Sequence, residues 1–287
     1  MQDKIHLAND LLNEVIERSI KRKSQGIEFN LTEISPLLNN FLYGLQRGKL
    51  TIVGGRPSNG KTAFMGEIAY TLAKQGQKVA FISLEMEGID IAERLTSRAM
   101  SIDNRAFYSG TAGEIAHLPE NQANLVKTDD IFSRIAITQN IGFTFSELEV
   151  VVKKYLTTHE VIIIDYLQMV KGSATAKDVI DEYIKNLRQL AIETNKVIIL
   201  GSQVNRGGTS KGDKEILPTM SDLKQSGAIE EVADVVMLCH WQYFYTKEPA
   251  DKNKYLIIVA KNRATGLTGY VPLFYEPEYY RFTKGQR

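Results

Sequence analysis

The stretch GGRPSNGKT, residues 54–62, contains the most informative motif of this 287-residue chain. It fits the pattern G-x-x-x-x-G-K-[ST], with Gly55, Gly60, Lys61 and Thr62 at the fixed positions. An apolar run, LTIV, precedes it, and a segment with helical spacing, AFMGEIAYTLAKQ, follows it. Strand, glycine loop and helix in this order form the context in which the motif binds phosphate. The sequence therefore predicts a phosphate-binding loop at the start of a helix.

Backbone N–H groups are expected to hold the phosphate. Glycine lets the chain curl so that successive N–H groups point inward, and the helix start adds unpaired N–H groups and the positive end of its dipole. We expect Lys61 to reach the β- and γ-phosphates and the Thr62 hydroxyl to bind Mg²⁺. The alternative is a glycine-rich turn with chance spacing. The predicted nucleotide-binding residues are Gly55, Arg56, Pro57, Ser58, Asn59, Gly60, Lys61, Thr62 and Ala63.

Composition limits the class of protein. The length suits one large α/β domain or two small ones. The net charge of +1 gives no global basic field, and this leaves binding of nucleic acid in a local groove open. The single cysteine, Cys239, excludes an internal disulfide and fits a reducing compartment such as the cytoplasm. No apolar stretch approaches the roughly 18 residues of a membrane helix, so we expect no membrane partner.

Strands and helices alternate after residue 50. Continuous apolar runs are typical of strands covered on both faces, hence of a largely parallel sheet, and the alternation predicts an α/β fold with helices on both sides. Residues 101–130 are polar and predict short helices and turns. Strands are predicted at 78–84, 134–138, 161–164, 197–200 and 234–238, helices at 90–100, 146–156 and 178–194, and an antiparallel C-terminal extension at 255–260, 269–275 and 279–282.

The first 24 residues predict an amphipathic helix that stands apart from the rest. Leu12, Val15, Ile16 and Ile20 belong to an apolar stripe at helical spacing. Such a stripe must be buried against something. Packing on the chain's own core and docking on a neighbouring subunit both satisfy the pattern.

Three polar side chains follow predicted strands. In an open α/β sheet the ligand lies beyond the carboxyl ends of the strands. Asp165 ends the run VIIID, where a carboxylate can hold Mg²⁺ through its water shell or cap a helix. Glu85 can take a proton from the water that attacks the γ-phosphate. Gln203 can hydrogen-bond the γ-phosphate and a polar neighbour together, or it is an ordinary loop glutamine.

Basic residues and long polar stretches come next. Lys261 and Arg263 alternate at a predicted strand end, so they share a face, and they suit either the neighbour's nucleotide, as an arginine finger does, or solvent. Residues 171–177 and 205–226 are long and rich in glycine and polar side chains. Such stretches are functional or disordered. They suit contacts to a phosphodiester strand, whereas base stacking is not expected because they lack aromatic residues.

These blocks together resemble the motor domain of the DnaB-type replicative helicases. The matching pieces occur in the family's order from about residue 29 to 282. They are LQRGKLTIVGGRPSNGKT, FISLEM, IIIDYLQMV, SQVNR, SDLKQSGAIEEVADVV and AKNRATGLTG. The resemblance implies a RecA-like P-loop NTPase core, 29–287, that works in a ring of six with ATP between subunits and single-stranded DNA in the channel. Residues 1–28 resemble the linker helix that docks on the adjacent subunit.

The resemblance also implies roles for single residues. Lys61 and Thr62 would hold phosphate and Mg²⁺, with Asp165 on the metal side. Glu85 resembles the catalytic glutamate and Gln203 the γ-phosphate sensor. The other implied roles fall on Lys261 and Arg263, which would reach the neighbour's nucleotide, and on Lys224, Gln225 and Gly227, which would contact the DNA backbone.

Two departures from the family pattern stand out. The family commonly has arginine and glutamate at the positions of Lys224 and Gln225. Lysine still neutralises a phosphate but lacks the two-pronged guanidinium fork. The resemblance also implies a separate N-terminal domain, through which primase and a helicase loader would bind, and we expect it to be missing here. The chain is then either an excised motor fragment or a natural short form. The sequence therefore favours an ATP-driven DNA helicase motor, with a recombinase-like, nucleotide-gated DNA-binding filament protein as the alternative.

Overall fold

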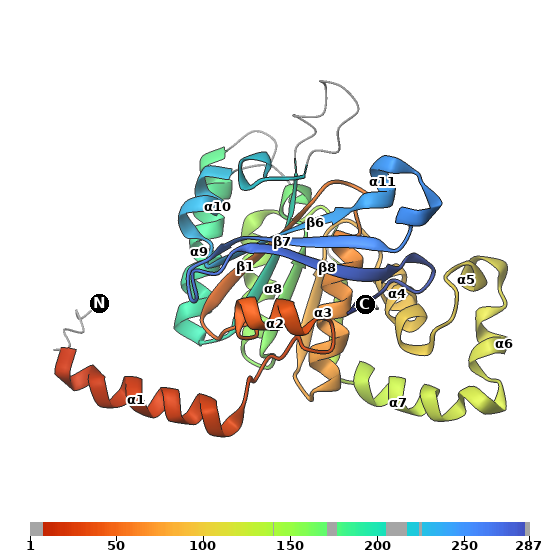
Figure 1. Ribbon diagram of the computed structural model, residues 1–287, viewed down its shortest axis with the longest axis horizontal. Helices are drawn as coiled ribbons and strands as arrows, with labels where there is room; N and C mark the ends of the chain where they lie inside the picture. The colour runs from red at the N-terminus through yellow and green to blue at the C-terminus, as the bar shows by residue number, and fades with distance from the viewer. Residues whose placement is uncertain (1–7, 140, 171–176, 205–216, 224–225, 285–287) are drawn as a thin grey trace.

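The architecture is a mixed sheet between two groups of helices. A computed structural model describes residues 8–139, 141–170, 177–204, 217–223 and 226–284 (Figure 1). Within these ranges, nine strands form one sheet in the order β3-β2-β4-β5-β1-β6-β7-β8-β9. The pairs from β3 to β6 are parallel, and those from β6 to β9 are antiparallel. The predicted α/β class, with a mostly parallel sheet and an antiparallel C-terminal extension, is confirmed.

The elements follow the predicted alternation of strand and helix. The strands are β1 (Lys49–Gly55), β2 (Val79–Ser83), β3 (Ile135–Gln139), β4 (Val161–Asp165), β5 (Val197–Gln203), β6 (Val235–Trp241), β7 (Lys254–Asn262), β8 (Gly269–Glu276) and β9 (Arg281–Thr283). The helices are α1 (Ala8–Gln25), α2 (Pro36–Leu42), α3 (Lys61–Lys74), α4 (Gly88–Met100), α5 (Arg105–Ser109), α6 (Ala112–Ala116), α7 (Gln122–Phe132), α8 (Phe145–Leu156), α9 (Lys177–Thr194), α10 (Ser226–Val232) and α11 (Gln242–Thr246).

Most strands differ from their predicted bounds by one or two residues, and β6 runs three residues beyond its predicted end, to Trp241. The differences at β5 and β9 have a clear physical reason. β5 runs three residues beyond the predicted end at Leu200, because Gly201, Ser202 and Gln203 continue to pair with β1. β9 starts at Arg281 instead of residue 279, because residues 277–279 form a 3-10 turn whose first residue is proline. Proline has no N–H to give to a sheet, so the strand begins after it.

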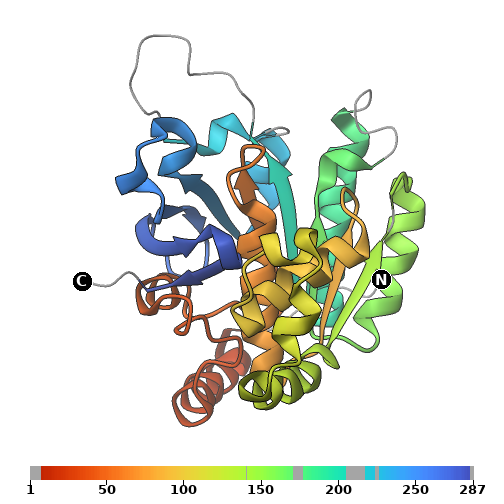
Figure 2. The same cartoon turned by 90° about the vertical axis from the view of Figure 1, so that its right-hand side faces the viewer.

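Each face of the sheet has its own core, as the alternation of side chains along a strand requires. One core joins Val53, Phe81 and Ile163 to α2, α3, α4 and α7. The other joins Ile52 and Ile164 to α8, α9 and α10. Figures 1 and 2 show the sheet between these two groups of helices. Because both faces are covered by helices, ligands can approach the sheet only at the carboxyl ends of its parallel strands, where the loops lie.

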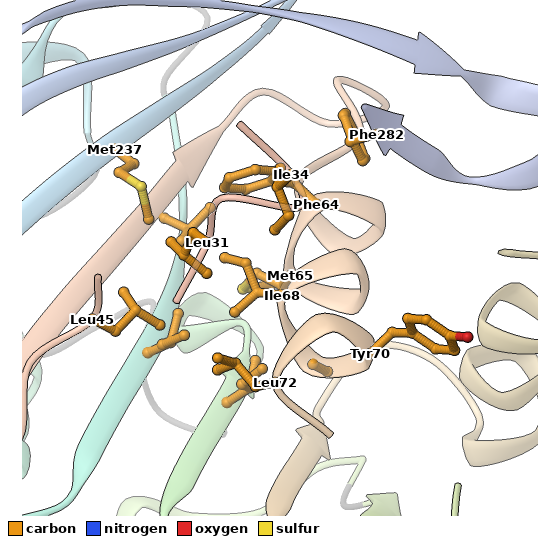
Figure 3. Close-up of a cluster of buried hydrophobic side chains, with 14 of the residues drawn as sticks. Leu31, Ile34, Leu45, Phe64, Met65, Ile68, Tyr70, Leu72, Met237 and Phe282 are labelled. Atoms are coloured by element: carbon orange, nitrogen blue, oxygen red, sulfur yellow. The ribbon is translucent and has the colours of Figure 1, made fainter. Parts of the chain in front are cut away.

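Helix α3, which follows the glycine loop, is buried along most of its length. Figure 3 shows Phe64, Met65 and Ile68 directed from α3 into a cluster with Met237 of β6 and Phe282 of β9. The Phe64 and Phe282 rings meet edge to face, with centroids 5.6 Å apart. Packing of this density resists movement, so the start of α3 is held at a fixed place beside the sheet.

A buried carboxylate joins α3 to α4 and β9. Glu67 is 1% exposed, and it accepts hydrogen bonds from Arg98 Nε at 3.0 Å and from the Phe282 backbone N–H at 3.0 Å. The Arg98 guanidinium also lies over the Tyr70 ring, 3.8 Å from its centroid. These contacts fix α4, which follows Glu85, against the helix that follows the loop.

Replacing Glu67 by alanine is expected to lower the free energy of unfolding by about 3 kcal/mol, because it leaves the Arg98 charge buried without its carboxylate. Urea denaturation measures the change. Glu33→Ala is the matched control. Glu33 also approaches Arg98, at 3.9 Å, but its side chain is 41% exposed, so we expect a loss of about 1 kcal/mol or less. Equal losses in the two variants would contradict this account of the Arg98 contacts.

Helix α1 extends away from the body of the molecule (Figure 1). Its apolar side chains are exposed, with Leu12 at 56%, Val15 at 61%, Ile16 at 48% and Ile20 at 62%. Packing of this stripe on the chain's own core, one of the two predicted alternatives, is therefore not what the structure shows. Among the described residues, no helix combines the length and apolar character needed to cross a membrane.

Candidate functional site

The glycine loop leaves β1 at its carboxyl end and turns into α3. Gly60 precedes the helix with φ +73°, and Ser58 has φ 62°, both in the left-handed region. A Cβ on Gly60 would lie 3.3 Å from the Tyr255 ring, a tight contact, and the positive φ would strain any other residue at this position. Gly60 gives α3 no side-chain cap. The first N–H groups of α3 thus remain available, which is the arrangement that binds phosphate.

Asn59 anchors the loop to the antiparallel side of the sheet. Its side chain is fully buried, and Oδ1 accepts a hydrogen bond from the Trp241 backbone N–H at 3.2 Å. The Tyr255 hydroxyl donates to the Asn59 backbone oxygen at 2.7 Å. The sequence placed Asn59 among the nucleotide-binding residues. In the structure its side chain contacts protein, so what it adds to that binding is the shape of the loop.

A compact charge cluster joins the loop to β4. Lys61 Nζ lies 2.7 Å from Asp165 Oδ1, and the Thr62 hydroxyl donates to Asp165 Oδ2 at 2.5 Å. Lys61 and Asp165 are 8% and 1% exposed. Lys61 Nζ also lies 3.6 Å from the centroid of the Tyr166 ring. The structure thus brings together the three residues that the sequence assigned to phosphate and metal.

Gly201 makes this meeting possible. The strand β5 lies between β4 and β1, so the Asp165 carboxylate must pass β5 to reach Lys61. A Cβ on Gly201 would lie 3.0 Å from Asp165 Oδ1 and 3.1 Å from the Tyr166 Cβ. Gly201 is not among the residues predicted from the sequence. The sequence nevertheless contains an indication of its role, because a glycine in or next to an aliphatic strand often lies where other groups approach the backbone closely.

Glu85 stands on the same edge, just beyond β2. It is exposed, unlike Asp165. Desolvation raises the pKa of the Glu85 carboxyl above its usual range, and Asp165 acts in the same direction, while Lys61 and Arg94 oppose the shift. A carboxylate with a raised pKa that faces open space is suited to accept a proton from water.

Gln203 ends β5 beside the start of the loop. It is the residue paired with Gly55 in the β1–β5 register, and its backbone N–H donates to Gln168 Oε1 at 3.0 Å. The side chain is partly exposed. The predicted sensor thus lies next to the predicted phosphate loop.

A hollow that no sequence motif predicted lies beside the first two turns of α3. Its lining includes Ala63 and Gly66 of α3, Arg94 of α4, and Tyr280. The Arg94 guanidinium lies over the Tyr280 ring, 5.1 Å from its centroid. A guanidinium plane and an aromatic ring are groups on which nucleobases stack. Long-range packing brings the two residues together, so no short motif marks them.

Lys261 and Arg263 lie at the opposite end of the strands from the glycine loop. Asn262, between them in sequence, pairs with Val235, which is level with Thr51 near the start of β1. From Thr51 to Gly55 the strand rises about 13 Å at ~3.3 Å per residue. Arg263 therefore cannot reach the loop of its own chain.

Both cations contact the carboxyl end of α10. Lys261 Nζ donates to the Glu230 backbone oxygen, and Arg263 donates to the backbone oxygens of Glu231 and, at 3.3 Å, Val232. Cations at this end of a helix satisfy its free carbonyls and its dipole. Partial burial and the nearby Arg263 lower the pKa of Lys261. The two side chains share a face, as the sequence predicted.

The predicted DNA contacts are described in part. Lys224 and Gln225 lie outside the described residues, as do most of the two long polar stretches. Gly227 lies in the first turn of α10, where the resemblance implied a loop, and it is exposed. A Cβ added to it would meet open space, so close approach of a phosphate backbone there is sterically free.

The loop, the uncapped helix and the Asp165 carboxylate at the end of β4 define a P-loop nucleotide-binding protein with a RecA-like sheet. A family model described as the DnaB-like helicase C terminal domain matches residues 31–284. The chain belongs to this family.

Known proteins with related sequences are replicative helicases. The chain is 34% identical to the replicative DNA helicase DnaC of Bacillus subtilis (strain 168) over 95% of its own length and 60% of the relative. It is 32% identical to the replicative DNA helicase DnaB of Geobacillus stearothermophilus over 91% of its length and 57% of the relative. The chain thus spans about three fifths of the curated relatives it matches.

Solved structures also resemble the fold. A DnaB-like replicative helicase, described with its interactions with primase, superposes with a TM-score of 0.80 at 26% identity and covers 99% of this chain and 68% of that chain. A second structure, described as an ATPase domain, superposes with a TM-score of 0.79 at 26% identity and covers 96% of this chain and 99% of that domain. The second match shows that the fold corresponds to an ATPase domain over nearly its full extent.

Proposed function

We propose that this chain is the ATP-hydrolysing motor of a replicative DNA helicase, working in the cytoplasm as a ring of six subunits on single-stranded DNA. The observation that carries the proposal is the cluster of Lys61, Thr62 and Asp165 at the uncapped start of α3, in a chain that matches the DnaB-like family over residues 31–284. The location follows the reducing-compartment argument from Cys239.

The residues of the site fit ATP and Mg²⁺. Hydroxyl and carboxylate oxygens are the ligands that Mg²⁺ prefers, and it usually takes one or two from protein and the rest from phosphate and water. Thr62 and Asp165 supply that set. The ion would neutralise charge that develops on the phosphates. The hollow lined by Thr62, Ala63, Arg94 and Tyr280 adjoins the loop, and we propose that it takes the base or ribose.

Each side chain has one step in the proposed reaction. Lys61, which pairs with Asp165 in this structure, turns to the β- and γ-phosphates. Glu85 orients the attacking water and accepts its proton. Gln203 hydrogen-bonds the γ-phosphate and so responds to its loss. The remaining transition-state charge requires a further cation.

That cation comes from the adjoining subunit in this proposal. Arg263 and Lys261 lie at the edge of the sheet opposite the loop, beyond reach of the nucleotide in their own chain. In a head-to-tail ring, the surface of one subunit that carries Arg263 and Lys261 faces the glycine loop of the next subunit. An arginine placed there stabilises the charge of phosphoryl transfer.

The ring is also proposed to use helix α1. Its stripe of Leu12, Val15, Ile16 and Ile20 is exposed. Residues 1–28 act as a linker, and residues 29–287 form the motor domain. The linker helix of one subunit docks on the adjacent subunit. Lys224, Gln225 and Gly227 contact the DNA backbone. One similar structure is described with its interactions with primase, and we propose primase and a helicase loader as further partners.

The proposal is tested by ATP turnover with and without single-stranded DNA, measured beside particle mass and unwinding of a forked duplex. We expect DNA-stimulated hydrolysis, a six-subunit particle and strand separation. DNA-stimulated hydrolysis with filaments and no unwinding would favour the recombinase-like alternative. A monomer that binds ATP without turnover would contradict the proposal.

A further inference from the structure

Gln168 connects the strand that carries Asp165 to the strand that carries Gln203. It belongs to the 3-10 helix η2 (Leu167–Met169), which is separated from β4 by Tyr166 alone. Gln168 Oε1 accepts a hydrogen bond from the Gln203 backbone N–H at 3.0 Å, and Gln168 Nε2 donates to Ser202 Oγ at 3.2 Å. Ser202 is fully buried. One side-chain amide therefore contacts two consecutive residues of β5.

The sheet pairing explains why an amide is needed there. The β4–β5 pairing runs from Val161–Val197 to Ile164–Leu200, whereas β5 stays paired with β1 as far as Gly55–Gln203. Successive N–H groups of a strand point to opposite sides. The Val204 N–H donates to Gly55 O at 3.1 Å, on the β1 side, so the Gln203 N–H points to the side where the β4 pairing has ended.

A glutamine amide carries the same donor and acceptor as a peptide group. At this point Gln168 takes the place that the next residue of β4 would have held in the ladder. The Gln203 backbone is thus fixed by β1 on one side and by Gln168 on the other, and the direction of its side chain follows from that backbone.

We propose that Gln168 is a positioning residue for ATP hydrolysis and acts through Gln203. This inference rests on the proposed function, in which Gln203 meets the γ-phosphate. Loss of the Gln168 amide would leave the Gln203 N–H without this partner. A displacement of the Gln203 side chain by a fraction of an ångström would then weaken its contact with the phosphate in the transition state.

Gln168→Met is the informative variant, because methionine has a similar length and no amide. We expect kcat for ATP hydrolysis to fall about tenfold, a loss of about 1.4 kcal/mol of transition-state stabilisation. KM for ATP and the Kd of a fluorescent ADP analogue should stay within about twofold, since the loop, Lys61 and Thr62 are unchanged. Gln168→Glu keeps an acceptor for the Gln203 N–H and should restore most of kcat. Gln189→Met, on the exposed side of α9, is the matched control.

A double-mutant cycle separates this role from a general structural one. In a Gln203→Ala background, Gln168→Met should cause no further loss of kcat, because its effect passes through Gln203. Losses that multiply, or a parallel rise in KM and fall in Tm, would overturn the proposal.

Hydrogen exchange provides a measurement that does not depend on activity. Without nucleotide, the Gln203 amide should exchange at least about tenfold faster in Gln168→Met than in the wild type, because its acceptor is gone. An unchanged rate contradicts the positioning role. If the wild-type chain failed to hydrolyse ATP, the proposed function would fail, while faster exchange would still establish the contact between Gln168 and Gln203.

Discussion

Arg263→Ala should lower kcat for ATP hydrolysis by about 10³ to 10⁵, the range found for arginine fingers in phosphoryl transfer. The guanidinium supplies charge to the transition state, so binding of ADP should change little. Steady-state turnover and ADP titration of the assembled particle measure the two effects. Arg105→Ala is the matched control, because Arg105 is 85% exposed and contacts Asp103 of its own chain.

Action between subunits makes a sharper prediction. Co-assembly of Arg263→Ala subunits with Glu85→Gln subunits should restore part of the turnover, although each variant alone retains only its residual rate. In a head-to-tail ring with random placement, about a quarter of the interfaces would join an intact loop to an intact Arg263. Mixed particles that remain as inactive as the separate variants would show that Arg263 does not complete a neighbour's site.

Glu85→Gln should lower kcat by about 10² to 10⁴, the range for loss of a general base. Glutamine keeps the size of the side chain and cannot accept the proton, so Kd for ATP should be retained. Glu87→Gln is the matched control, since Glu87 is exposed two residues away and forms no side-chain cap on α4. Turnover by Glu85→Gln at the wild-type rate would show that Glu85 is not the general base.

The pH dependence of kcat gives a second measurement on Glu85. Only the ionised carboxylate accepts a proton, so kcat should fall as the pH drops through the pKa of Glu85. Desolvation and Asp165 raise that pKa, and the acidic limb should therefore lie above the usual range of glutamic acid. The residual activity of Glu85→Gln should lack this limb.

The sequence alone predicted the features that depend on residues close together along the chain. The loop at residues 54–62 lies between a strand and a helix because its flanking residues have the matching periodicities. Asp165 and Glu85 lie on one edge because the carboxyl ends of parallel strands meet there. The antiparallel extension was visible as short apolar runs between turn residues. Each of these inferences needs only neighbouring residues and the rules of one sheet.

What the sequence did not reveal depends on contacts across the chain. The Tyr255 hydroxyl reaches the Asn59 backbone across 196 positions, and no short motif encodes that distance. Gly201 was visible as a glycine, but its reason, the passage of the Asp165 carboxylate, requires the strand order. The contact of Gln168 with the Gln203 backbone likewise could not be predicted, because it depends on where the β4–β5 pairing ends.

The most direct test of the central claim is the structure of the assembled particle with Mg²⁺ and a nonhydrolysable ATP analogue. We expect Lys61 Nζ to have left Asp165 for the phosphates, Thr62 and Asp165 to lie on the metal, and Arg263 of the adjoining subunit to approach the γ-phosphate. An empty loop with the Lys61–Asp165 pair intact would contradict nucleotide binding. A filled loop whose charges all come from its own chain would contradict the shared site.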